Sequence, residues 1–185
     1  AVKADILKLN AAIIDTTIPE FVFKEIDFTQ LETYIQNPNR NVVRMLLKTL
    51  AYEHQVTLLP SKWEIEHIFP QKWQTNYFIE ESESLIKEKI EHIGNKIPFE
   101  KKLNIVAGNS YFEKKKKEYS LSKIEITRKL GISDIKDWNM ESIVKRDLRV
   151  SDSIISILKK WNKEYIEITT KSISNRPSEE DLARI

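Results

Sequence analysis

The chain is 185 residues long and carries a net charge of only +2, with 41% hydrophobic and 31% charged residues. This composition excludes an intrinsically disordered chain, and because no apolar run approaches the length needed to cross a bilayer, it also excludes a membrane-spanning protein. The complete lack of cysteine excludes disulfides, thiolate zinc sites and a cysteine nucleophile. We therefore expect a soluble, cytoplasmic protein with one well-buried domain.

The beginning of the chain predicts helices that act as a scaffold. Residues 1–39 are expected to form an N-terminal helical or linker segment, with a helix capped by Asp27 and stopped at Asn37-Pro38-Asn39. Apolar residues then recur at intervals of three and four from Val42 to Ala51. This spacing is typical of a helix that buries one stripe of its surface.

The middle of the chain predicts two strands on either side of an inserted helix. Residues 56–68 suit an extended path that leads into His67, and residues 79–91 have the pattern of an amphipathic helix. Gly94 then precedes a second short strand. A tight entry into that strand can demand a positive φ, which glycine adopts without steric cost.

The remainder of the chain predicts helices and a polar tail. A helix is expected from Asn104 to about Lys117, with an interruption at Gly108-Asn109. Another is expected to end at Gly131, and residues 139–161 predict one or two helices separated at Ser151-Asp152-Ser153. Residues 166–185 are read as a polar C-terminal tail.

One group of residues carries the chemistry of phosphodiester hydrolysis. The run Glu66-His67-Ile68-Phe69-Pro70 is followed by Gly94-Asn95 and, nine residues after Asn95, by Asn104. Hydrolysis requires a base that deprotonates water and a divalent cation that neutralises the growing charge. His67 is the candidate base, because a neutral imidazole is well populated at physiological pH. Glu66 and Asn104 are the candidate metal ligands, and oxygen ligands favour Mg²⁺ or Mn²⁺ over zinc.

These positions resemble a known nuclease family. A histidine at the end of one strand, a return strand and a ligand at the start of the next helix resemble the ββα-metal unit of HNH nucleases. More narrowly, the chain resembles the nuclease domain at the C-terminus of GmrSD-like type IV restriction endonucleases. The similarity spans roughly residues 40 to 162 and rests on Glu66-His67-Ile68-Phe69-Pro70, Gly94-Asn95, Asn104, Asn109, Phe112-Glu113-Lys114-Lys115, Trp138, Ile143, Arg146 and Leu148.

The resemblance implies a fold, an activity and a set of partners. It implies an α+β, mostly helical fold with a ββα-metal (HNH) core and flanking helices, with the nuclease domain at residues 40–165. It also implies a divalent-metal-dependent DNA endonuclease of a modification-dependent restriction or phage-defence protein. In that pattern Asn95 braces the loop that carries the histidine. A ParB-like nucleotidase domain would precede this domain in a longer protein, and the need for a homodimer stays open.

A basic run predicts contacts with nucleic acid. Residues Lys114 to Lys117 lie close to Asn104 in the sequence, and lysines beside a metal site neutralise phosphates. We expect Asn109, Lys114 and Lys115 to contact the phosphate backbone. Taken alone, the same run is better explained by a solvated helix face.

Two departures from the family pattern support an alternative function. The strand after Asn95 contains Lys96 and Pro98, where the family prefers apolar residues, and the acid is Glu66, where many HNH sites have the shorter Asp. The chain could therefore be a catalytically weakened nucleic-acid-binding or assembly module. A helical scaffold without either activity is a third reading, and RNA as the substrate stays open.

Overall fold

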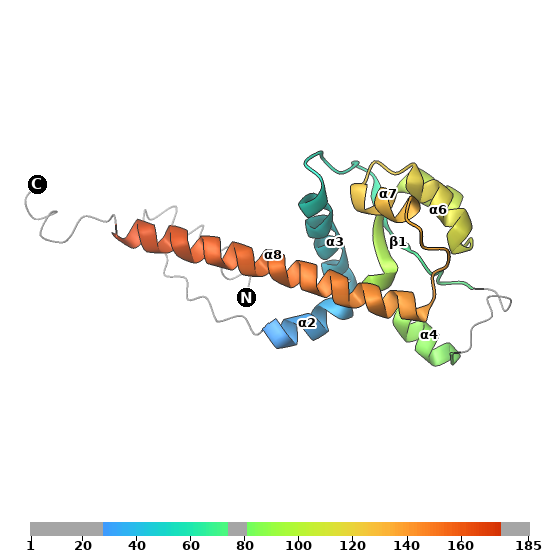
Figure 1. Cartoon of the computed structure of the whole chain (residues 1–185), viewed down its shortest axis with the longest axis horizontal. Helices are drawn as coiled ribbons and strands as arrows, with labels where there is room; N and C mark the ends of the chain where they lie inside the picture. The colour runs from blue at the N-terminus through green and yellow to red at the C-terminus, as the bar shows by residue number, and fades with distance from the viewer. Residues whose placement is uncertain (1–27, 74–80, 175–185) are drawn as a thin grey trace, which may run out of the picture.

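A computed structural model of the chain describes residues 28–73 and 81–174. Most of this part is helical and two short strands form a small sheet, which confirms the predicted α+β, mostly helical fold (Figure 1). The elements are α2 (Phe28–Gln36), α3 (Arg40–His54), β1 (Trp63–His67), α4 (Glu83–Ile90), the 3₁₀ helix η2 (Ile93–Asn95), β2 (Lys96–Glu100), α5 (Lys101–Ala107), α6 (Phe112–Ser120), α7 (Glu125–Gly131) and α8 (Met140–Ser174).

The two strands form an antiparallel pair that carries the predicted motif. In their register His67 lies opposite Lys96, and Glu66 lies opposite Ile97. Pro98 lies opposite Ile65. It is tolerated because each strand of a two-stranded sheet has a free edge.

Helices cover the sheet from both sides. A two-stranded sheet is marginal by itself and needs a packed face, and Figure 1 shows β1 between α3 on one side and α6 on the other. Ile65 packs toward apolar residues of α3, whereas Phe99 of β2 forms an edge-to-face contact with Tyr119 of α6, with ring centroids 5.0 Å apart. The strands are therefore held in place by two separate apolar clusters.

The apolar stripe of α3 is confirmed. Val43, Leu46, Leu47, Leu50 and Ala51 are buried, and most of them pack in a cluster with Ile35 of α2 and Ile154 of α8. The helix begins after Asn39, whose side chain accepts a hydrogen bond from the Val42 amide at 3.1 Å. The predicted stop between the first two helices therefore also serves as the start of the second.

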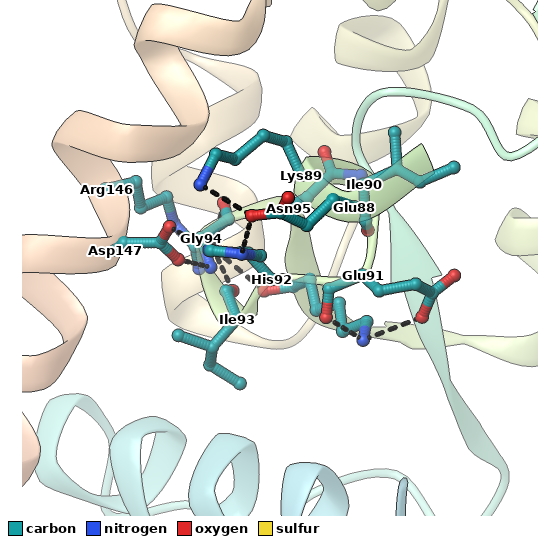
Figure 2. A network of polar contacts seen from close by, with 11 residues as sticks. Glu88, Lys89, Ile90, Glu91, His92, Ile93, Gly94, Asn95, Arg146 and Asp147 are labelled. Atoms are coloured by element: carbon teal, nitrogen blue, oxygen red, sulfur yellow. Dashed lines mark hydrogen bonds and ion pairs between the residues drawn. The ribbon is translucent and has the colours of Figure 1, made fainter. Parts of the chain in front are cut away.

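Helix α8 fixes the turn that leads into β2 (Figure 2). The Asp147 carboxylate accepts a hydrogen bond from the Gly94 amide at 2.6 Å and bonds His92 Nδ1 at 2.7 Å. The guanidinium of Arg146 donates to three carbonyl oxygens of residues 93–96 at 2.8 to 3.2 Å. Burial lowers the pKa of Arg146 to about 10, so it remains charged at neutral pH. One helix thus satisfies several of the polar groups of this turn.

The expected backbone role of Gly94 is wrong, and packing explains this glycine. Among the described residues, the glycine with a positive φ is Gly108, at 51°. A Cβ on Gly94 would lie 2.3 Å from the Ile143 carbonyl oxygen and 2.7 Å from Asp147 Oδ1. Gly94 is therefore required because α8 approaches the backbone closely.

Three boundaries differ from the prediction. The strand begins at Trp63 and not near residue 56, and α8 runs through Ser153 without a break. The Ser153 hydroxyl donates to the Arg149 carbonyl one turn earlier, at 2.8 Å, so a serine is accommodated inside the helix. Helix α8 ends at Ser174, beyond the predicted start of the tail at residue 166.

Some expectations lie outside the described residues. They include the cap at Asp27, most of the segment 1–39 and the end of the tail. The helices that the structure describes include none with both the length and the apolar character needed to cross a bilayer.

Candidate active site

His67 is the last residue of β1 and lines a cleft. Its side chain is 17% exposed, and its Nε2 atom is buried 3.5 Å from Glu91 Oε1, too far for a hydrogen bond; no other described residue supplies one. Burial lowers the pKa of His67, with Lys96 and Lys115 acting in the same direction and Glu91 opposing them. The imidazole is therefore neutral at physiological pH, which is the form that a general base requires.

Glu91 is a charged neighbour of His67 that the motif does not reveal. Its carboxylate accepts a hydrogen bond from Gln71 at 2.8 Å and lies 3.0 Å from Lys96 Nζ, which also bonds the Glu91 carbonyl oxygen. Burial would raise the pKa of Glu91, but these partners outweigh it and lower the pKa to about 2. The sequence offers one indirect signal for a carboxylate near His67. It is Lys96, the partner of Glu91, which the hairpin register places opposite His67.

Glu66 is buried and paired with a cation. Its Oε1 accepts hydrogen bonds from Lys115 Nζ at 2.7 Å and from the Tyr119 hydroxyl at 2.8 Å. Lys115 also donates to the His67 carbonyl oxygen at 2.7 Å. Burial raises the pKa of Glu66 against the opposing effect of Lys115, and burial lowers the pKa of Lys115 against the opposing effect of Glu66. The pair ties α6 to the end of β1.

The role predicted for Lys115 in phosphate binding does not fit this arrangement. Only 1% of Lys115 is exposed, and its ammonium is engaged by two acceptors inside the protein. The sequence signal that it faces inward is its spacing of three residues from Phe112 and four from Tyr119, both buried. Lys114 and Asn109 are exposed, and their contacts with nucleic acid stay predictions.

Asn104 lies on α5 and faces a different carboxylate from the predicted one. Its Nδ2 atom is 3.4 Å from Glu64 Oε2, and no hydrogen bond among the described residues joins it to Glu66. Glu64 was missed in the sequence, although it is two residues before Glu66 and so shares its side of the strand. Glu64 is also 3.4 Å from Lys101 Nζ.

The chemistry of this donor set fits a hard divalent cation. Glu64, Glu66 and Asn104 offer only oxygen ligands, which Mg²⁺ and Mn²⁺ prefer. Within the described ranges, no group of three or more His, Cys, Asp and Glu side chains is arranged to hold a metal. A site here therefore has to combine carboxylates with the amide of Asn104, and a cation at Glu66 has to share that carboxylate with Lys115 or displace it.

Asn95 braces the segment that follows His67. Its Oδ1 accepts a hydrogen bond from the Phe69 amide at 2.7 Å, and its Nδ2 donates to the carbonyl oxygens of Phe69 and Ile90 at 2.9 and 3.1 Å. Its own carbonyl accepts from the Ile68 amide at 2.9 Å. These contacts are of the kind that the supporting role predicted for Asn95 requires.

A polar cleft of about 960 Å³ opens beside His67. It lies where the start of α3 faces β1 and the end of α4. Its lining consists of Asn37, Pro38, Arg40, Asn41, Val43, Arg44, Glu64, Ile65, His67, Gln71, Glu91 and Lys96. The candidate base therefore has access to a cavity whose walls carry amides and both signs of charge.

Comparison with known protein families matches residues 23–151 to GmrSD restriction endonucleases, C-terminal domain. No curated protein and no solved structure matches the chain. The matched span covers well over half of the chain and includes His67, Glu66, Asn95, Asn104 and the cleft. The chain therefore belongs to the family formed by the C-terminal domain of GmrSD restriction endonucleases.

Proposed function

We propose that this domain is a divalent-metal-dependent DNA endonuclease of the HNH type, acting in a modification-dependent restriction or phage-defence protein. The observation that carries the proposal is His67, a neutral imidazole at the wall of a polar cleft and at the end of the strand where the HNH pattern requires its base. Family membership supports the reaction class.

In this proposal His67 takes the proton from the attacking water. Its Nε2 faces the Glu91 carboxylate at 3.5 Å, which favours the tautomer with the proton on Nε2. The lone pair on Nδ1 is then the one that accepts the proton. As water attacks phosphorus, the bond to the leaving oxygen breaks, and the imidazolium that forms is stabilised by the charge of Glu91.

The oxygen atoms of Glu66 and Asn104 would hold the cation, with Glu64 close to Asn104. When bound, Mg²⁺ or Mn²⁺ supplies the positive charge that stabilises the phosphate and the leaving oxygen. Asn95 would hold His67 in position through the segment that follows it. An N-terminal ParB-like nucleotidase domain and a homodimer remain predictions for the longer protein.

A second candidate function is a nucleic-acid-binding or assembly module with weakened catalysis. The observation that favours it is the pairing of Glu66 with Lys115, because a carboxylate held by an internal ammonium is less available to a metal ion. This function predicts DNA binding that weakens with salt and no cleavage.

The test is a plasmid-nicking assay of the wild type, His67→Ala and the control His54→Ala, each with Mg²⁺, with Mn²⁺ and with a chelator. His54 is an exposed histidine at the end of α3, outside the cleft. We expect metal-dependent relaxation of supercoiled DNA by the wild type and by His54→Ala. Loss of the general base should slow the reaction by about 10²- to 10⁴-fold in His67→Ala.

Two outcomes would contradict the nuclease. Equal cleavage by His67→Ala and the wild type would place the base elsewhere. If all three proteins are inactive and the wild type still binds DNA in a salt-dependent way, the weakened module is the better description.

A further inference from the structure

The start of α3 lies outside the β1, β2 and α5 unit that carries the candidate base and ligands, yet it forms one wall of the cleft beside His67. We propose that Arg40 and Arg44 of this helix bind the phosphates of the DNA strand that enters the cleft. This inference rests on the proposed function and adds the path of the substrate to it. It gives the DNA strand a path along α3, whereas the lysine run predicted one along α6.

The charges of the cleft favour an anionic ligand at α3. Lys96 is neutralised by Glu91 at 3.0 Å, and Glu64 lies 3.4 Å from Lys101. In the described part of the chain, no carboxylate forms an ion pair with Arg40 or Arg44, and both are exposed. The positive charge that remains unpaired on the cleft walls therefore belongs to these two arginines.

The two arginines are placed to act together. Residues four apart lie on the same side of a helix, so Arg40 and Arg44 point along one face of α3. The Arg44 guanidinium is 3.8 Å from the centroid of the Trp63 ring, and its Nη2 donates to the Trp63 carbonyl at 3.1 Å. A guanidinium has five N–H donors, so most of them stay free for phosphate oxygens while the group is held in place.

The space and the neutral donors suit a nucleic-acid backbone. Asn37 and Asn41 add amide groups to the same wall as the arginines. The volume of about 960 Å³ is at the upper end of the roughly 300–1,000 Å³ found for pockets of drug-sized ligands, so a phosphodiester with its flanking sugars has room. His67 lines the same cleft, which brings a phosphate bound at α3 toward the candidate base.

Helix α6 offers fewer free cations to a DNA strand than its sequence suggests. Lys115 is buried against Glu66, and Lys116 donates to the carbonyl oxygens of Ser133 and Ile135 at 2.6 and 2.7 Å. Half of the lysine run is thus committed to internal acceptors. Phosphate contacts position a strand without reading its sequence, so α3 would orient any DNA over His67.

The test measures binding of a short labelled DNA duplex by fluorescence anisotropy, in chelator and over a series of salt concentrations, with the whole 185-residue chain. The variants are Arg40→Gln, Arg44→Gln, Lys114→Gln and the control Lys145→Gln, an exposed lysine on α8. We expect Arg40→Gln and Arg44→Gln to weaken binding several-fold. Each should also reduce the slope of log K against log salt by about 0.9, the value for one phosphate contact. Lys145→Gln should bind as the wild type does, and Lys114→Gln should lose less affinity than either arginine variant.

Arg40 makes no ion pair within the described ranges, so Arg40→Gln keeps the test decisive even if loss of the Arg44 contact with Trp63 unfolds that variant. An unchanged slope in Arg40→Gln would overturn the inference. So would a loss confined to Lys114→Gln, binding of an RNA duplex but not of DNA, or no DNA binding by the wild type. Chelator prevents metal-dependent cleavage, so this assay measures binding apart from catalysis. A protein that binds DNA through Arg40 here but is inactive in the nicking assay would refute the nuclease and leave this DNA path intact.

Discussion

Replacing Lys115 by Met should lower the free energy of unfolding by about 3–5 kcal/mol at neutral pH. Lys115 makes two hydrogen bonds of 2.7 Å, one to the Glu66 carboxylate and one to the His67 carbonyl. A hydrogen bond that involves a charged group contributes about 1.5–3 kcal/mol, so the two together account for a loss of this size. Because Met fills most of the space of the lysine stem, the loss reports the unpaired carboxylate and not a cavity.

Acidification and a second substitution should both restore part of the stability that Lys115→Met loses. Burial raises the pKa of Glu66 above the ordinary 4.5, and removal of Lys115 should raise it further. A carboxyl with a raised pKa adds stability below the pKa of the unfolded chain and loses it as the pH rises through the folded value. The difference in free energy of unfolding between the wild type and Lys115→Met should therefore shrink as the pH falls toward 4.5. The double variant Lys115→Met with Glu66→Gln, which buries no charge, should recover most of the loss.

Urea unfolding followed by the fluorescence of the four tryptophans provides the measurement. With an m-value of about 2 kcal/mol per M, the single variant should shift the midpoint down by about 2 M. A loss of less than about 0.5 kcal/mol, within the range of surface substitutions, would refute a stabilising role of the buried pair. A double variant no more stable than the single one would show that the charge of Glu66 is not the source of the cost.

Further predictions concern the turn and the cleft. Gly94→Ala places a Cβ 2.3 Å from the Ile143 carbonyl oxygen. We expect this variant to have a lower thermal midpoint and a free energy of unfolding reduced by about 1–3 kcal/mol. An unchanged midpoint would mean that α8 moves aside freely. Asn95→Ala leaves three backbone groups without their side-chain partner. Each buried group left unsatisfied should lower the free energy of unfolding by about 1–3 kcal/mol, which urea unfolding measures. A total loss smaller than that of a single group would contradict the bracing contacts. Glu91→Gln removes a carboxylate whose pKa is lowered from 4.5 to about 2, so the stability advantage of the wild type should persist above pH 4.5 and vanish as the pH falls toward 2. Because Glu91 is half-exposed, that stability advantage should not exceed about 1 kcal/mol. An advantage that does not change with pH across this range would contradict the lowered pKa of Glu91.

Local pattern predicted the scaffold well because its signals are contained within single elements. The apolar spacing of α3 and the break at Gly108 between α5 and α6 both appear in the structure near their predicted positions. The break predicted in α8 is absent, because the Ser153 hydroxyl finds its acceptor inside the helix. A serine-rich stretch in the sequence does not distinguish that arrangement from a loop.

The site was less predictable because it depends on contacts between distant residues. The motif indicated His67 and Asn95. The spacing of Lys115 from Phe112 and Tyr119 indicates that this lysine faces inward, but it does not show that the partner is Glu66, 49 residues earlier. Glu91 next to His67 and the arginines of α3 along the same cleft follow from packing between elements. Spacing along the chain carries no information about such neighbours.

The clamp of α8 on the turn before β2 also has a consequence for how the domain assembles. The groups that Arg146 and Asp147 satisfy lie 50 to 55 residues earlier in the chain. Such distant contacts cost loop-closure entropy before they contribute stability, so η2 should become ordered late in folding. A chain that ends before Arg146 would contain both strands and the candidate base, yet the turn between α4 and β2 would lack these partners. The start of α8 therefore marks the shortest form in which this domain can be complete.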